Sequence, residues 1–67
     1  MTKIGQKVIF RARQDRKEAG YQTELVCDGL EALVVGIPSR SQTYAVVDFT
    51  NGWRNVCLEQ ANLEAIA

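Results

Sequence analysis

The sequence contains no histidine, a single proline and only two cysteines among its 67 residues. Without histidine, the protein lacks the side chain most often used as a general base and as a metal ligand. Cys27 and Cys57 are too far apart in the sequence for the short spacings of zinc-binding or redox motifs. We therefore predict two reduced thiols that pack as small hydrophobic side chains, and we expect no cofactor and no bound metal.

The chain also lacks net charge and long apolar runs. Eight Lys and Arg residues offset eight Asp and Glu residues, whereas nucleic-acid-binding domains are usually basic overall. No apolar run approaches the roughly 18 residues that a membrane span needs, and the first ten residues show no secretory core. These absences predict a soluble cytoplasmic protein that does not contact a membrane.

Charge is nevertheless distributed unevenly. Residues 1–20 contain six cations and two carboxylates, a local charge of +4, and residues 21–67 carry a charge of −4. Such asymmetry favours a dipolar surface that attracts an acidic partner or allows head-to-tail contact between copies. An ordinary solvated hairpin is the alternative interpretation.

A chain of 67 residues is long enough for one domain, which we assign to residues 1–67. A domain of this size buries only about 60% of the surface that its unfolded chain exposes. Its stability is therefore expected to be marginal, or to be shared with a partner.

Short alternating or apolar stretches bounded by turn residues predict strands at 7–13, 30–37, 44–49, 53–58 and 63–66, with residues 23–27 as a candidate return strand. Residues 14–22 are predicted to form a long polar loop, although their composition also suits a short helix or an extended hairpin. Asn51-Gly52 predicts a type I′ hairpin turn, because both of its central positions require positive φ. Residues 59–62 can form only a single helical or 3₁₀ turn.

This order of elements predicts an all-β fold: a five-stranded SH3-like small barrel with a long first loop and one helical turn before the last strand. The period of two along each strand assigns side chains to opposite faces. The predicted core consists of Val8, Phe10, Ala32, Val34, Ala45, Val47, Phe49, Val56, Leu58, Leu63 and Ile66.

The opposite face of the third and fourth main strands is unusually apolar. It collects Tyr44, Val46, Trp53 and Cys57. An aromatic patch on a small domain usually marks a contact surface, although residues 14–22 could instead fold over it. Trp53 beside Tyr44 is the predicted anchor, and Asp48 and Arg54 are expected to set the orientation of a partner.

Four short runs stand out between the turns: Gly5-Gln6-Lys7-Val8, Val34-Val35-Gly36, Tyr44-Ala45-Val46 and Leu63-Glu64-Ala65-Ile66. Together they resemble the skeleton of SH3-like barrels of the plasmid-borne type II dihydrofolate reductase kind, most specifically over residues 32–66. Small SH3-like accessory subunits of photosynthetic complexes share this skeleton. The resemblance implies the fold, a tendency to form homo-oligomers and carriage on a mobile genetic element.

The type II reductases line their active-site pore with a Val-Gln-Ile-Tyr run. The matching positions here read Asn55-Val56-Cys57-Leu58, so the glutamine and the tyrosine are absent. The sequence also has no glycine-rich phosphate-binding motif. A carboxylate such as Asp48 more ordinarily pairs with Arg54 across the hairpin than acts as a catalytic acid. We therefore expect no enzymatic activity.

These features predict a non-enzymatic protein-interaction module that binds a protein partner or a second copy of itself. The predicted binding residues are Tyr44, Val46, Asp48, Trp53, Arg54 and Cys57. The alternative is a small nucleic-acid-binding barrel in which Tyr44 and Trp53 stack on bases. Its basic patch would comprise Arg11, Arg13, Arg16 and Lys17, with Arg40 and Arg54 as further phosphate contacts. A diverged reductase-like pore enzyme is a third interpretation.

Overall fold

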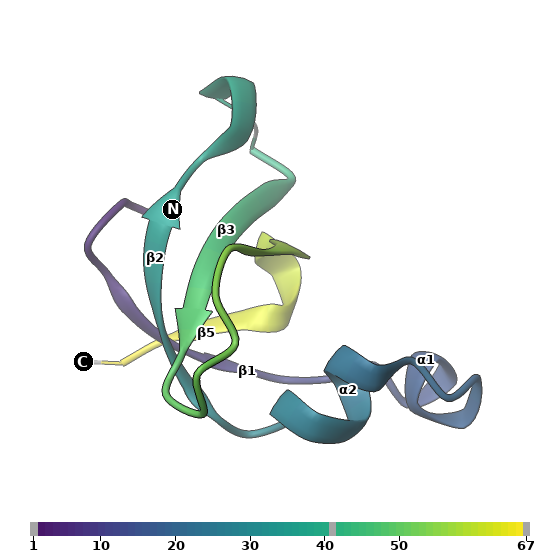
Figure 1. Cartoon of the computed structure of the whole chain (residues 1–67). Coiled ribbons are helices and arrows are strands. Elements are labelled where there is room, and N and C mark those ends of the chain that lie inside the picture. The colour runs from purple at the N-terminus through teal and green to yellow at the C-terminus, as the bar shows by residue number, and fades with distance from the viewer. Residues whose placement is uncertain (1, 41, 67) are drawn as a thin grey trace.

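The computed structural model describes residues 2–40 and 42–66, and it is built mainly on one antiparallel sheet (Figure 1). The five strands are β1 (Lys7–Phe10), β2 (Glu31–Gly36), β3 (Tyr44–Phe49), β4 (Val56–Glu59) and β5 (Leu63–Ala65). Their order in the sheet is β4-β3-β2-β1-β5, so the last strand returns to pair with the first.

Four short helical elements connect the strands: α1 (Gln14–Glu18), α2 (Gln22–Cys27), and the 3₁₀ turns η1 (Pro38–Arg40) and η2 (Gln60–Asn62). The turn η2 confirms the expectation of a single helical turn before the last strand. None of the helices in the described part of the chain is long and apolar enough to cross a membrane.

The core lies on one face of the curled sheet. The rings of Phe10 and Phe49 meet edge to face, with centroids 5.8 Å apart, although β2 lies between their two strands. The buried apolar residues are Val8, Phe10, Cys27, Ala32, Val34, Ala45, Val47, Phe49 and Leu58. Of the other predicted core residues, Val56 and Leu63 are half-buried against this cluster. Ile66 is exposed, against the prediction, because the alternation along β5 turns it to the face opposite Leu63 and Ala65, the partners of the core residues Phe10 and Val8.

An irregularity in β2 helps the sheet to curl. The pairing of β2 with β3 shifts register between Val34 and Gly36, which leaves Val35 as an extra residue. An extra residue in one strand bends it and increases its twist. Because β2 pairs with β1 on one side and β3 on the other, this bend brings the two neighbours around a shared core (Figure 1).

For residues 14–22, the short-helix alternative is confirmed at Gln14–Glu18, whereas the long polar loop and the strand over residues 23–27 are wrong. These segments form the consecutive helices α1 and α2. Glu24 and Cys27, three positions apart, are buried, while Leu25 and Val26 are exposed. That is the facing pattern of one helical turn packed on a core, and the six residues of α2 are too few for sequence periodicity to show it.

The turn at Asn51-Gly52 also differs from the predicted type I′ geometry. The Gly52 N–H donates to the Phe49 carbonyl at 3.3 Å, and the Phe49 N–H donates to the Trp53 carbonyl at 2.7 Å. Gly52 has positive φ, whereas Asn51 does not. This is the pattern of a type I turn followed by a glycine bulge. The side chain of Asn51 accepts the Trp53 N–H at 3.1 Å, which stabilises this turn.

A second irregularity follows at Asn55, whose φ is 54°. Its N–H donates to the carboxylate of Asp48 at 2.9 Å, and the structure shows no ion pair between the described residues Asp48 and Arg54. The expected strand over residues 53–58 therefore begins only at Val56. The extra residue reverses the alternation of faces, so Trp53 lies half-buried against the core and not on the predicted outer face.

Asp28 joins the ends of the helical segment. Its carboxylate accepts the Ala12 N–H at 3.0 Å and the Lys17 ammonium group at 3.0 Å. The hydrogen bond from Ala12, followed by that from Lys17, lowers the pKa of Asp28 below its ordinary value. The carboxylate thus fastens Ala12, which lies two residues before α1, and α1 itself to the end of α2.

Substitution of Phe49 by alanine should remove most of the stability of this small domain. Loss of a buried phenylalanine typically costs about 3–5 kcal/mol through lost burial and the cavity left behind. Urea unfolding followed by circular dichroism measures the effect. As a matched control, Leu33→Ala truncates an exposed side chain on β2 and should change the free energy of unfolding by about 1 kcal/mol or less. A stable Phe49→Ala variant would contradict the assigned core.

Asp28→Asn should destabilise the protein at neutral pH by about 1 kcal/mol, because the ion pair is partly exposed to solvent. A lowered folded-state pKa stabilises the protein above the unfolded-state pKa, and this contribution disappears as the pH falls through the folded-state pKa. The difference between the variant and the parent, measured by urea unfolding, should therefore vanish at strongly acidic pH. A difference that is constant with pH would contradict this role for Asp28.

Candidate functional site

A pocket of about 360 Å³ lies where α1 and α2 approach β3 and β4. Its walls include Arg16, Tyr21, Glu24, Tyr44, Cys57 and Glu59. We refer to it as the tyrosine pocket. A second recess, of about 420 Å³, is lined in the described part of the chain by amide, hydroxyl and aliphatic side chains such as Gln6, Gln60 and Leu63. The tyrosine pocket therefore has the richer chemistry.

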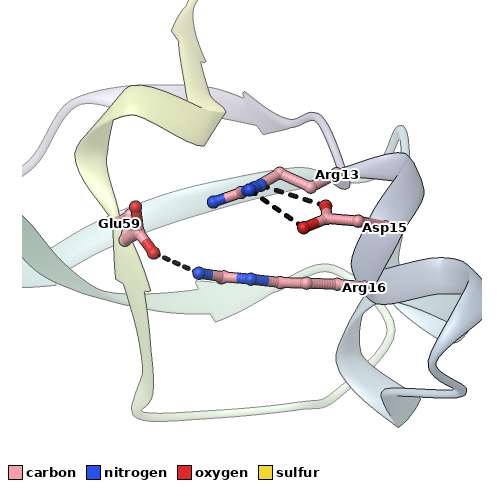
Figure 2. A network of polar contacts seen from close by, with 4 residues as sticks. All are labelled: Arg13, Asp15, Arg16 and Glu59. Carbon is pink, nitrogen blue, oxygen red and sulfur yellow. Dashed lines mark hydrogen bonds and ion pairs between the residues drawn. The ribbon is translucent and has the colours of Figure 1, made fainter.

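One wall of the tyrosine pocket is an ion pair between α1 and β4. Arg16 extends from α1 and donates to the Glu59 carboxylate, beside the bidentate contact of Arg13 with Asp15 (Figure 2). The side chains of Arg16 and Glu59 are each half-buried. The hydrogen bond that Arg16 donates to Glu59 is the largest of the effects that raise the pKa of Arg16, and the negative charges of Glu59, Glu24 and Asp15 contribute. This contact braces the helices against the edge strand.

Glu24 is the most unusual residue of the pocket. It lies in the first turn of α2, and only 3% of its surface is exposed. Its Oε2 atom is the one buried side-chain nitrogen or oxygen among residues 2–39 and 42–66 that lacks a hydrogen-bond partner. Buried polar groups in native proteins are almost always paired, so an unpaired carboxyl oxygen at a pocket calls for an explanation.

Two tyrosines flank the pocket from different elements. Tyr21 immediately precedes α2 as its N-cap residue, and Tyr44 begins β3, where it pairs with Glu59 of β4. Both side chains are about half exposed. Tyrosine presents an apolar ring together with a polar tip, a combination that is frequent at binding surfaces.

The apolar surface continues from the pocket along α2. The Leu25 N–H donates to the Tyr21 carbonyl at 3.0 Å, which places Leu25 one helical turn after Tyr21. Leu25 and Val26 are 51% and 44% exposed, respectively, because the side of α2 that faces the core is occupied by Glu24 and Cys27. Helix α2 therefore presents large apolar side chains to solvent next to the pocket.

The two cysteines occupy opposite environments, and both are free thiols. Cys27 packs in the core as the small hydrophobic residue that was predicted, and burial raises its pKa. Cys57 is exposed and lines the tyrosine pocket, so the same prediction is wrong for Cys57. The pocket thus contains an accessible thiol, whereas the second thiol is shielded.

The structure brings together only some of the predicted binding residues. Val46 and Cys57 are cross-strand partners, and both project to the same side of the sheet as Tyr44. Trp53 packs against the core, Asp48 holds the bulge at Asn55, and Arg54 is exposed in the loop before β4. The helical segment does not cover the predicted face, because Tyr44 and Cys57 remain exposed.

Sequence reasoning missed Tyr21 and Glu24 because residues 14–27 were not predicted to be helical. The available signal was the helical spacing of Tyr21, Glu24 and Cys27, at intervals of three residues. The same segment is equally compatible with a strand in which Thr23, Leu25 and Cys27 share one face. Only the packing of α2 on the sheet distinguishes the helix from the strand.

All four cations of the predicted basic patch are ion-paired. The pairs are Arg11 with Glu64, Arg13 with Asp15, Arg16 with Glu59, and Lys17 with Asp28. Three of these pairs join residues 1–20 to residues 21–67, so the charge asymmetry of the sequence is largely neutralised within the molecule. Phosphate binding would have to compete with these carboxylates.

The described residues contain no group of three His, Cys, Asp or Glu side chains placed to hold a metal ion. Searches of protein-family models, curated proteins and solved structures find no match to the chain. The chemistry of the tyrosine pocket is therefore the basis for assigning a function.

The basic patch should make little contribution to nucleic-acid binding, because its cations are already neutralised. In fluorescence titrations with single-stranded and double-stranded oligonucleotides, the parent chain and an Arg11→Ala, Arg13→Ala double variant should behave alike. Tight binding by the parent that weakens and loses its salt dependence in the double variant would support the nucleic-acid interpretation instead.

Proposed function

We propose that this protein is a non-enzymatic protein-interaction module of the SH3-like small-barrel type. The strand order, in which the last strand pairs with the first beside a curled β1–β2–β3 sheet, supports this architecture. We do not extend the proposal to reductase activity. At the positions that resemble the reductase pore run, Asn55 lies in the bulged loop and Val56 begins β4.

The proposed contact surface is the tyrosine pocket together with the exposed side of α2. The observation that carries the proposal is that two half-exposed aromatic side chains, Tyr21 and Tyr44, line one pocket, while Leu25 and Val26 are exposed on the helix that begins after Tyr21. Aromatic residues contribute disproportionately to binding energy at protein interfaces. Exposed side chains of this kind on a domain with so small a core suggest that a partner covers them.

The proposed partner is another protein, and a second copy of this chain is the alternative. The argument for head-to-tail self-association rested on the charge asymmetry of the sequence. The three ion pairs between residues 1–20 and residues 21–67 now account for much of that asymmetry within one molecule. The apolar surface alone does not depend on charge, and it suits a partner with a complementary apolar face.

Photo-crosslinking from Cys57 tests this proposal. A benzophenone maleimide should label Cys57 selectively in the native chain, because Cys27 is buried and its pKa is raised. Irradiation in an extract of the source cells should give a discrete adduct that excess unlabelled chain suppresses and that mass spectrometry identifies. Tyr21→Ser should weaken this adduct strongly, because serine preserves a good helix N-cap while it removes the ring.

The matched control carries the label elsewhere on the sheet. A Cys57→Ser, Leu33→Cys variant places the probe at an exposed position of β2, outside the tyrosine pocket. It should give no competed adduct. An adduct of two copies of the chain would identify self-association, which light scattering over a range of concentrations would verify. Equal crosslinking from both positions, or none from either, would contradict the proposed surface.

A further inference from the structure

The unpaired Oε2 atom of Glu24 defines what the tyrosine pocket lacks. A buried carboxyl oxygen without a hydrogen-bond donor costs free energy, and the cost is recovered when a donor arrives. Glu24 is almost fully buried in α2, yet it lines the pocket through which a ligand can approach. The missing partner is therefore a group that donates a hydrogen bond.

The charge of the pocket favours a cationic donor. Its Arg, Lys, Asp and Glu lining residues are Arg16, Glu24 and Glu59, with a formal charge of −1 when the carboxyl groups are ionised. The guanidinium group of Arg16 is already engaged by Glu59. Glu24 itself forms no ion pair with any described residue, and the pocket keeps a net negative charge after Arg16 is counted, so a positively charged ligand would complement the site.

The flanking rings of Tyr21 and Tyr44 suit the same class of ligand. A cation that lies over the face of an aromatic ring is attracted by the ring quadrupole, and the attraction increases when water is excluded. The aliphatic stem of a long cationic side chain can also pack against these rings. The volume of about 360 Å³ leaves ample space for such a side chain.

The number of unpaired acceptors distinguishes lysine from arginine. A guanidinium group binds best to two oxygens at once, in a planar bidentate arrangement. Among the described residues, the one buried oxygen of the pocket without a partner is Oε2 of Glu24, and Arg16 donates to Oε1 of Glu59. A compact ammonium group, which acts as a point charge with several donors, is the better match.

We propose that the tyrosine pocket binds the ammonium group of an unmodified lysine side chain on the partner protein. In this arrangement Glu24 Oε2 accepts a hydrogen bond from the lysine Nζ, and Tyr21 and Tyr44 flank the stem. This inference rests on the proposed function, because it names the side chain by which a protein partner would be recognised.

The test is a nuclear magnetic resonance titration of the ¹⁵N-labelled full chain with Nα-acetyl-lysine methylamide. Saturable shifts are expected at backbone amides around the pocket, with a dissociation constant in the millimolar range for a single side chain. The Nζ-acetyl derivative, which has no charge, should cause no saturable shift. The Nζ-trimethyl derivative keeps the charge but has no N–H donor, so it should bind about tenfold more weakly.

Two variants assign the effect to Glu24. Glu24→Gln keeps the size of the side chain but removes the carboxylate, and it should weaken the lysine probe about tenfold or more. Glu31→Gln removes an exposed carboxylate of β2 that lies outside the pocket, and it should leave the affinity unchanged. The dispersion of the amide spectrum confirms that each variant is folded.

Several results would overturn the inference. These are the absence of saturable shifts up to about 100 mM lysine probe at constant ionic strength, equal binding of the acetylated or trimethylated probe, or unchanged affinity in Glu24→Gln. A competed crosslink from Cys57 combined with any of these results would leave the interaction surface intact and reject only the lysine. Loss of both would reject the interaction surface as well.

Discussion

The position of Phe10 is the constraint on which the rest of the structure depends. Its ring meets Phe49 across the curled sheet, and β5 pairs with it through Leu63. Its backbone accepts the Gly29 N–H at 2.8 Å and donates to the Leu30 carbonyl at 3.1 Å, which secures the chain just after α2. Because one residue joins the core, the last strand and the end of the helical segment, these parts can form only together.

The tyrosine pocket is a consequence of this arrangement. With its end held beside Phe10, α2 places Cys27 in the core, and Glu24, one turn earlier, becomes buried beside the pocket. Arg16 then reaches Glu59 and fixes α1 against the edge strand. The same packing that stabilises the helices therefore leaves Oε2 of Glu24 without a partner and two half-exposed tyrosines lining the same pocket.

The alternation of β1, β2 and β3 was predictable, because each strand buries one face and a period of two is unambiguous there. The alternation of residues 53–58 could not be predicted, because the bulge at Asn55 adds one residue and turns Trp53 towards the core. The two helices within residues 14–27 could not be predicted either, because helices of five and six residues are shorter than the stretch over which a helical period can be recognised. Tyr44 and Cys57 were found as site residues, whereas Tyr21 and Glu24 were missed.

The sequence by itself determined the apolar face of the sheet, the turn before the last strand and the exposure of Tyr44, since these follow from local composition and period. Only the tertiary structure decided that the four cations of the basic patch are paired and that Oε2 of Glu24 is buried without a donor. The reason is physical. Ion pairs such as Arg16 with Glu59 join residues far apart in the chain, and the burial of a carboxyl group depends on everything that packs around it.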